Sequence, residues 1–176
     1  MKSGSVSFNT YLCALALAAV VCGCHTEKAN EKNPKKQLTL LRLHTESAAG
    51  RTSPGIEVPI YRARPTMVPI DRDAFVTEAN VVAAAVLEQQ GSFAIELQLD
   101  RQGTWLLEKF TVTNPGRRIA VFCSFPEDRW VAAPIVPKVI STGRLVFTPD
   151  ATREEAERIV RGLNNMSRKK KTSSNF

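Results

Sequence analysis

The alternation of apolar and polar residues is clearest in FAIELQL, residues 93–99. Its four large apolar residues fall on one face, a period of two that predicts a strand with one buried face. The apolar run VVAAAVLE at 81–88 precedes it, and the turn sequence QQGS separates the two. We therefore expect a β-hairpin whose first strand follows a short helical turn near 77–83.

Strands are also expected nearer the amino terminus. The sequence LTLLRLH at 38–44 alternates so that two leucines face a core and His44 lies on the exposed side. Four prolines between residues 54 and 69 exclude a helix in the next segment. Short strands at 57–61 and 66–70 are expected instead, at a sheet edge where a missing N–H group is tolerated.

A central strand is predicted at 118–125, because RIAVFCSF is apolar on both faces. Cys123 lies within it, so burial should raise the pKa of its thiol and make it unreactive. After the turn sequence PEDR, residues 130–133 are expected to run back beside this strand until Pro134 ends the pairing. The last strand expected is LVF at 145–147.

A first helix is predicted at 104–113. Asp100 is placed to cap its amino-terminal end, and Asn-Pro-Gly follows its last turn. Leu106 and Phe110 are spaced one turn apart, so they define the side of this helix that faces the core.

A second helix is predicted after Thr152 and Glu155, which form a capping box in which each side chain accepts from the other residue's backbone amide. Apolar residues then recur at i, i+3, i+4 and i+7 between Ala156 and Leu163, which predicts one face packed on a sheet. The basic residues that follow lack this pattern, so we expect 166–176 to be a disordered tail.

The amino terminus has the pattern of a secretion signal. Twelve apolar or small residues, YLCALALAAVVC at 11–22, are too few to span a bilayer, which takes about 20. They fit the core of a signal peptide. The next residues resemble the bacterial lipobox, so we expect a lipoprotein signal peptide at 1–23, cleaved between Gly23 and Cys24, with Cys24 acylated by palmitate or a similar fatty acid.

Two alternatives to lipidation remain open. An uncleaved segment or an ordinary signal peptide could carry these cysteines incidentally. A zinc site of Cys22, Cys24 and His25 has a tighter spacing than usual, and no second ligand pair follows. In the lipoprotein interpretation, 24–37 is a flexible tether and 38–165 a single domain.

Charge and cysteine content narrow the function classes. The chain has a formal net charge of +7, and its basic residues gather before and after the expected domain. Basic ends favour anionic lipid or solubility, whereas nucleic-acid binding would favour a basic stripe on a folded face. Once the signal peptide is removed and Cys24 is acylated, Cys123 is the one remaining thiol, so no disulfide framework is expected.

Candidate catalytic groups are sparse. Cys123 and His44 could pair as nucleophile and base, but no third member of such a site is apparent. The acidic residues of Asp71-Arg72-Asp73 are typical of a solvated bend, and no glycine-rich phosphate loop occurs. We therefore expect neither an enzyme nor a metal site, and no cofactor.

Short motifs in the second half of the chain resemble, in order, those of the head subdomain of the first periplasmic domain of SecD and SecDF, membrane subunits that assist Sec-dependent protein export. The motifs are Asp100-x-x-Gly103, Phe110-Thr111, Gly116-Arg117-Arg118-Ile119-Ala120-Val121, Ala133-Pro134, Ile140-x-x-Gly143, Phe147-Thr148 and Thr152-x-Glu154-Glu155-Ala156. The resemblance covers about 78–164, and more weakly 57–77. It implies an α+β, ferredoxin-like two-layer sandwich, with two main helices on one face of an antiparallel-rich sheet.

The chain also departs from that family. The connection at 124–129 is longer than the Asp-Gly turn common there. No run of residues predicts transmembrane helices with the ionisable groups that couple a proton gradient to movement, so a proton-driven motor is not expected. The resemblance therefore implies a fold more directly than an activity.

The function expected is a lipid-anchored binding module that faces the periplasm from the bacterial cell envelope. It would contact exported polypeptides or Sec-type envelope proteins through sheet edges at 57–70 and 130–137, with Tyr61, Trp130 and Pro134 as candidate contact residues. Taken singly, Trp130 fits a packed position better than a presented one. A self-associating structural lipoprotein is the alternative, and a hydrolase is less favoured.

Overall fold

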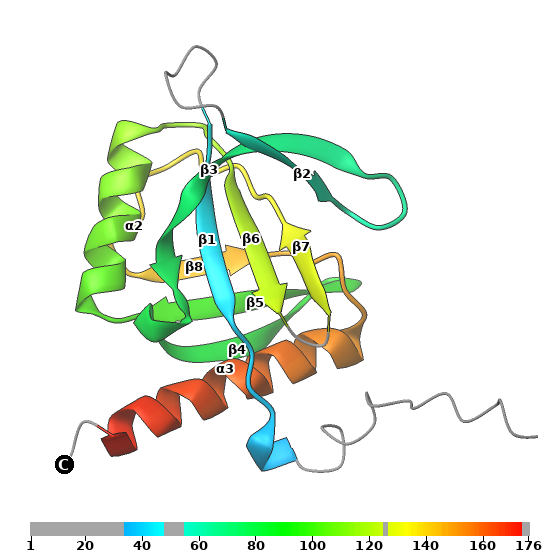
Figure 1. Cartoon of the computed structure of the whole chain (residues 1–176), viewed down its shortest axis with the longest axis vertical. Helices are drawn as coiled ribbons and strands as arrows, with labels where there is room; N and C mark the ends of the chain where they lie inside the picture. Colours follow the sequence, from blue (N-terminus) through cyan, green and yellow to red (C-terminus); the bar gives the residue numbers. More distant parts are fainter. Residues whose placement is uncertain (1–33, 48–54, 125–126, 174–176) are drawn as a thin grey trace, which may run out of the picture. The chain divides into compact units, whose positions relative to one another are not determined.

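The computed structural model describes residues 34–47, 55–124 and 127–173, which belong to a unit running from Asn33 to Phe176. Its strands form two antiparallel sheets, accompanied by two long helices (Figure 1). The first sheet has the order β2-β3-β1-β6-β7 and the second β4-β5-β8. The predicted α+β sandwich with antiparallel strands and two main helices is confirmed, and its strands divide between two sheets.

The elements have the following bounds. The first sheet contains β1 (Leu41–Glu46), β2 (Ile56–Ile60), β3 (Thr66–Thr77), β6 (Ile119–Ser124) and β7 (Asp128–Ala132). The second contains β4 (Val81–Gln89), β5 (Ser92–Leu99) and β8 (Arg144–Phe147). The helices are α2 (Arg101–Thr113) and α3 (Arg153–Ser173), with short 3₁₀ turns η2 (Pro34–Lys36) and η3 (Glu78–Asn80).

The predicted hairpin at 81–99 is confirmed. β4 and β5 pair from Val81–Leu99 to Gln89–Ser92, and η3 supplies the expected helical turn before β4. Gly91 lies in the turn with φ of 73°, a conformation that favours a residue without a Cβ. β8 pairs on the other side of β5 and completes the small sheet.

β1 occupies the middle of the large sheet, and one prediction made for it is wrong. Leu41 and Leu43 are fully buried, as expected, but His44 is also buried, with 6% of its surface exposed. The ring of His44 contacts that of Trp130, with centroids 5.1 Å apart, and its Nδ1 lies 2.9 Å from the Asp71 carbonyl oxygen. Both faces of β1 are covered, so alternation within the strand does not expose the polar residue.

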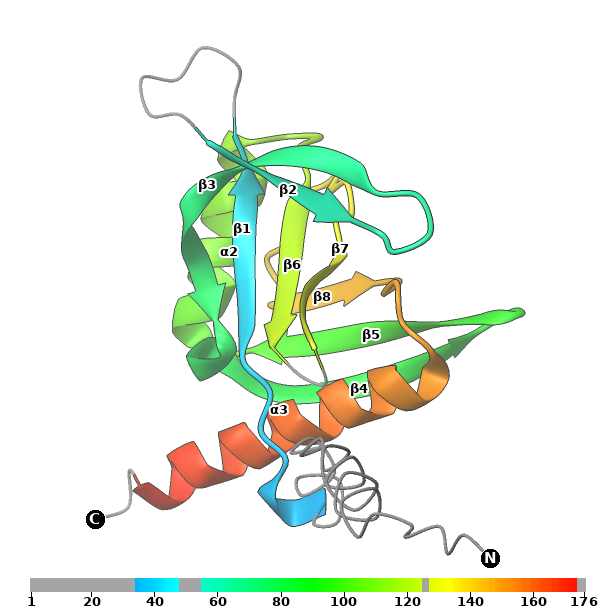
Figure 2. The same cartoon turned by 45° about the vertical axis from the view of Figure 1, so that its right-hand side comes forward.

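β3 is longer than expected because it bends. Its register on β1 shifts so that His44 pairs with Ala74 and Glu46 with Ile70, which leaves Asp71-Arg72-Asp73 as a bulge. The Thr45 hydroxyl donates to the Asp71 carboxylate at 2.6 Å and holds this bulge in place. Beyond it, the outer half of β3 and all of β2 cross over the sheet towards β7 (Figure 2).

The edge prediction is correct for one of the two proline-containing strands. β2 is an edge strand, but β3 lies between β2 and β1, so the assignment of 66–70 to an edge is wrong. Pro69 is tolerated inside the sheet because β3 is irregular there, and its carbonyl accepts a bond from the Ser47 amide at 2.9 Å.

The central strand β6 is confirmed between β1 and β7, with Cys123 buried and its pKa raised by burial to about 12. The prediction that pairing ends at Pro134 is wrong. The Ile119 amide donates to the Pro134 carbonyl at 3.0 Å, and Arg118 forms a bridge with Ile135. Proline removes a donor but keeps its acceptor, so the segment continues beside β6.

Both predicted helix caps are confirmed, although α2 begins at Arg101, three residues before the predicted start at 104. The Asp100 carboxylate accepts from the Gly103 amide at 2.8 Å, and Thr152 and Glu155 form the capping box. The predicted disordered tail is wrong for 166–173, because α3 continues to Ser173. Ser167 and Lys170 bond to backbone carbonyls outside the helix, and these contacts stabilise its last turns; residues 174–176 lie outside the described residues.

Candidate polypeptide-binding surface

One edge of the small sheet is covered by α3. The Asn164 side-chain amide bonds both backbone groups of Ala84, accepting from its N–H and donating to its carbonyl at 2.9 Å each. Ser167 and Lys170, three and six residues further along, donate to the carbonyls of Val82 and Ala79. The helix thus takes the place that a further strand would occupy beside β4.

β7 is also covered on its outer side. The amide of Asp150 donates to the Val131 carbonyl at 2.7 Å, so the link between β8 and α3 lies against this strand. Arg129 of β7 bonds the Asp150 carbonyl from the side. Backbone groups of β7 that would attract an added strand are therefore partly satisfied.

β2 differs from both, because among the described residues it pairs only with β3. Residue pairs of an antiparallel ladder alternate between those that exchange two hydrogen bonds and those whose backbone groups point away. Glu57–Pro69 and Pro59–Met67 must be of the second kind, since proline has no N–H. The outer edge of β2 therefore offers both groups of Glu57 and the carbonyl of Pro59.

The outer face of the β2–β3 hairpin is apolar and exposed. We call it the hairpin face; it consists of Glu57, Pro59, Met67 and Pro69, all exposed and alternating with buried residues. Met67 is 52% exposed, and Tyr61 at the tip is 43% exposed. Methionine adapts its shape to varied partners, so such a face suits contacts with polypeptides of differing sequence.

The inner face of the same hairpin forms a second, small core. It contains Val58, Ile60, Val68, Ile70, Ala120 and Ala133. The half-buried Trp130 packs against this cluster and also contacts the ring of Phe122, with centroids 5.3 Å apart. The hairpin is therefore held over β6 and β7 by apolar packing, which keeps its outer face presented.

Arginines fasten the tip of the hairpin to the rest of the domain. We call this group the arginine clasp: Arg62 after β2, Arg129 on β7, Asp150, and Glu155 of α3. The Arg62 guanidinium lies 2.7 Å from the Glu155 carboxylate. The backbone N–H of Arg62 donates to the Asp150 carboxylate at 2.7 Å. Arg129 lies 3.2 Å from Glu155 and 3.4 Å from the Asp150 carboxylate.

The arginine clasp lowers the pKa of Glu155. Burial raises the pKa of Glu155, but the Thr152 amide and Arg62 outweigh burial and lower it below its ordinary value. The hydrogen bond to Glu155 likewise raises the pKa of Arg62. Just before Arg62, Tyr61 has φ of 72°, a left-handed conformation that costs about 1 kcal/mol in a residue with a side chain. The clasp is part of what holds the turn in this conformation.

The three predicted contact residues lie in three different environments. Tyr61 lies exposed at the hairpin tip, Trp130 is packed under the hairpin, and Pro134 is half-buried beside β6. The packing expected of Trp130 is confirmed, and contact with polypeptide stays a prediction for all three. Sequence reasoning missed Met67, although its place between Pro65 and Pro69 could have indicated an outward side chain.

Cys123 and His44 cannot act together. Cys123 faces the main core with Leu41, whereas His44 lies on the opposite face of the sheet beside Trp130. In the part of the chain that the structure describes, no group of three His, Cys, Asp or Glu side chains could hold a metal ion. Gly23, Cys24 and the alternative zinc ligands lie outside the described residues.

A family model for the "SecDF, P1 head subdomain" matches residues 57–165. The chain belongs to this family. The match runs from Glu57 of β2 to Asn165 of α3, so it includes the hairpin face, the clasp and every described strand except β1. It confirms the resemblance drawn from the ordered motifs, including the weaker part at 57–77. Among curated proteins, none matches the chain.

Three solved structures are similar to the chain, and the first of them shows the same fold. One described as a membrane component SecDF that enhances protein export is 17% identical, covers 93% of this chain and 71% of its own, and has a TM-score of 0.53. A SecDF in a super-membrane-facing form gives 14% identity and 0.47, and one from Thermus thermophilus, described as translocon-associated, gives 21% and 0.46. Those two alignments cover 76% and 78% of this chain but only 30% and 20% of the SecDF chains.

No helix among residues 34–47, 55–124 and 127–173 has the length and apolar character needed to cross a bilayer.

Proposed function

We propose that this chain is a lipid-anchored module of the bacterial cell envelope that faces the periplasm and binds polypeptide, either an exported chain or a Sec-type envelope protein. Membership of the SecDF P1 head family supports an envelope location and a link to protein export. The observation that carries the proposal is the hairpin face, an exposed and largely apolar surface that the small core and the arginine clasp hold in place.

Edge and face would contribute differently to binding. Glu57 can both donate to and accept from an extended peptide, whereas Pro59 can only accept, so strand addition at β2 is short. The apolar side chains of Met67, Pro69 and Tyr61 would then supply contact area beside that short ladder. Such binding is weak and tolerant of sequence, as contact with many different unfolded chains requires.

Crosslinking from defined positions tests this proposal. A photoreactive amino acid replaces Met67 in the full chain, and in a control it replaces Val146, which is exposed on β8 in the other sheet. After irradiation of the producing cells, we expect adducts with exported chains or Sec components from position 67 and none from 146. Equal adducts from both positions, or adducts only with this chain itself, would contradict the proposal; the second result would favour a structural, self-associating role.

The lipid anchor is tested separately. Cells grown in labelled palmitate should label the wild-type chain, and Cys24→Ala should abolish the label. Cys22→Ala serves as the control and should keep it. A wild-type product that carries no label, with residue 24 internal to the purified polypeptide, would refute acylation at this site.

A further inference from the structure

The carboxy-terminal part of α3 is strongly basic. Between Arg158 and Ser173 it carries six basic side chains and no acidic one. They are Arg158, Arg161, Arg168, Lys169, Lys170 and Lys171. Helix-dipole compensation favours cations in the last turn, but this run begins several turns earlier.

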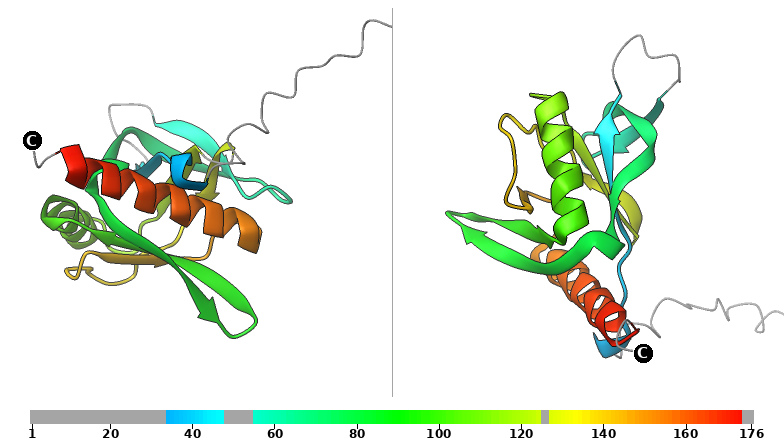
Figure 3. Two further views of the ribbon diagram at one scale, coloured as in Figure 1. Left: turned by 90° about the horizontal axis from the view of Figure 1, so that it is seen from below. Right: turned by 90° about the vertical axis from the view of Figure 1, so that its left-hand side faces the viewer.

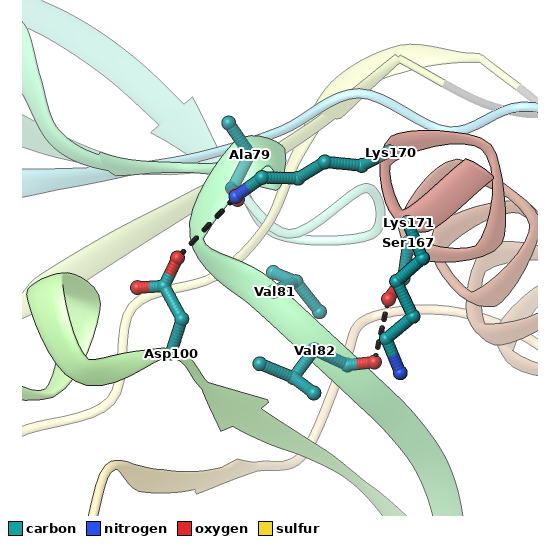
Figure 4. A pocket seen from close by; sticks show the side chains of 7 residues that line it. All are labelled: Ala79, Val81, Val82, Asp100, Ser167, Lys170 and Lys171. Carbon is teal, nitrogen blue, oxygen red and sulfur yellow. Dashed lines mark hydrogen bonds and ion pairs between the residues drawn. The ribbon is translucent and has the colours of Figure 1, made fainter. Parts of the chain in front are cut away.

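Lys170 has a structural task. Its ammonium group bonds the Ala79 carbonyl at 2.6 Å and lies 3.4 Å from the Asp100 carboxylate, across the small pocket that Ser167 also lines (Figure 4). This lysine fixes the end of α3 against η3 and the start of α2. The remaining exposed basic residues extend from a helix whose position is thereby set.

Arg161 and Arg168 share one stripe of α3, about 10 Å apart along its axis. A pocket of about 330 Å³ lies between them, with the apolar side chains of Val86 and Val160 in its lining. Glu157 also lines it, but its carboxylate is paired with Arg153 at 3.1 Å. The pocket therefore combines two guanidinium groups and two asparagine amides with two apolar side chains, which matches the phosphate and the adjoining glycerol of a phospholipid.

The amino-terminal entry to the domain lies beside this surface. Asn165 of α3 donates to the carbonyls of Pro34 at 2.8 Å and Gln37 at 2.9 Å, so η2 is held along the helix (Figure 3). η2 adds the exposed Lys36. Cys24 precedes Pro34 by ten residues, which cannot span more than about 36 Å. An acyl chain on Cys24 would thus leave this side of the domain within reach of the bilayer, without fixing its orientation.

From these observations we propose that the outward face of α3, from Arg161 to Lys169 together with Lys36, docks on the anionic phospholipid surface of the membrane. The proposal rests on the envelope location given under the proposed function. Docking would set the orientation of the domain, so that α2 and the end of the large sheet distant from α3 point away from the bilayer.

The test uses the full chain, expressed with its own amino terminus and reconstituted with vesicles that contain an acceptor-labelled lipid. A fluorescent donor is placed at Thr172→Cys on α3 or at Val112→Cys on α2, which lies about 18 Å further along α2 than Asp100, the partner of Lys170. Cys123 is buried and should not react. On phosphatidylcholine vesicles with phosphatidylglycerol we expect greater energy transfer from 172 than from 112, and on phosphatidylcholine alone no difference.

Matched variants assign the effect to the proposed face. Each basic residue at an anionic surface changes the docked-to-undocked ratio by about fivefold, so Arg161→Gln, Arg168→Gln and Lys169→Gln together should lower it on the order of a hundredfold. The control replaces three exposed basic residues elsewhere, Arg64→Gln, Arg72→Gln and Lys138→Gln, and should keep the difference between the two probes.

The outcomes separate this inference from the anchor. Flotation with phosphatidylcholine vesicles of the wild-type chain, but not of Cys24→Ala, reports acylation. If flotation persists but positions 172 and 112 give equal transfer on anionic vesicles, docking is refuted and the anchor stands. If flotation fails but the anionic vesicles still give the difference, the anchor is refuted and docking stands. If energy transfer from position 172 does not depend on lipid composition but changes when an oligonucleotide is added, the basic face binds nucleic acid and the inference is overturned.

Discussion

β4 and β2 are both edge strands, but the unpaired backbone groups of the two edges are treated in opposite ways. At β4, Asn164 and Ser167 of α3 bond the backbone of the strand, and Lys170 bonds η3 just before it, so the helix occupies the place of another strand. At β2, no other described element bonds the outer edge in the same way; prolines shorten the available ladder, and the hairpin is held by its inner face and the arginine clasp. One edge is closed by polar bonds and the other is accessible, which is why we propose β2 as the binding edge.

The largest effect should follow from removing the packing that holds the hairpin. Ile60 is fully buried in the small core under β2, so Ile60→Ala should lower the free energy of unfolding by about 3 kcal/mol in urea denaturation. Ile56→Ala, at the exposed end of the same strand, should change it by less than about 0.5 kcal/mol. Similar losses for both variants would show that the inner face does not hold the hairpin.

Removing the cover from the edge of β4 should lower the free energy of unfolding slightly less. Asn164→Ala leaves the amide and carbonyl of Ala84 without their partners, and we expect a loss of about 2 kcal/mol. Asn165→Ala loses bonds to η2 instead of β4, so β4 amides should keep their protection from hydrogen exchange in that variant. If the β4 amides exchange at the same rate in Asn164→Ala as in the wild type, the bonds from Asn164 do not protect this edge.

The clasp should give a smaller, pH-dependent effect. Glu155 has its pKa lowered in the folded state, so its ionised form contributes stability that is complete above its ordinary value of 4.5 and is lost as pH falls through the lower folded pKa. Glu155→Gln should therefore lower the unfolding free energy by about 1 kcal/mol at neutral pH, and the difference from wild type should shrink below about pH 4.5. Glu157→Gln is a suitable comparison on the same helix. A Glu155→Gln deficit that stays constant down to acid unfolding would exclude the ionised clasp as its cause.

The hairpin face should show almost no effect on stability. Met67→Ser removes exposed apolar surface, so the unfolding free energy should change by less than about 0.5 kcal/mol. Crosslinking from a photoreactive residue at Tyr61 should nevertheless fall in this variant, and Val146→Ser should leave it unchanged. A Met67→Ser chain with undiminished crosslinking would remove the hairpin face as the binding surface and leave only the edge of β2.

Sequence reasoning worked best where one residue pattern had one physical meaning. The alternation at 93–99, the capping box of Thr152 and Glu155, and the doubly apolar strand with Cys123 each identified their elements. It failed where distant segments decided the outcome. His44 is buried beneath Trp130 of β7 and against the bulge of β3. α3 extends past 166 because Ser167 and Lys170 bond carbonyls of β4 and η3, 85 and 91 residues earlier. Neither partner is visible in the local sequence.

The candidate surface was predicted only in part. The prolines indicated two short strands at a sheet edge, which is correct for β2 and wrong for β3. They could not show that the two strands pair as a hairpin, or that a bulge at Asp71-Arg72-Asp73 turns it across the sheet. Trp130 and Tyr61 come from segments that the structure joins through the small core and the clasp. The sequence therefore indicated the segments, while the bend in β3 determined which side chains face outward.

The amide of Asn165 links the first described residues of the chain to its last helix. A force applied at the amino terminus would accordingly act on α3 before it acts on β1, because η2 is bonded to the helix. The two ends of the domain would therefore move together, and a pull on the amino terminus would tilt the whole domain before it detached β1.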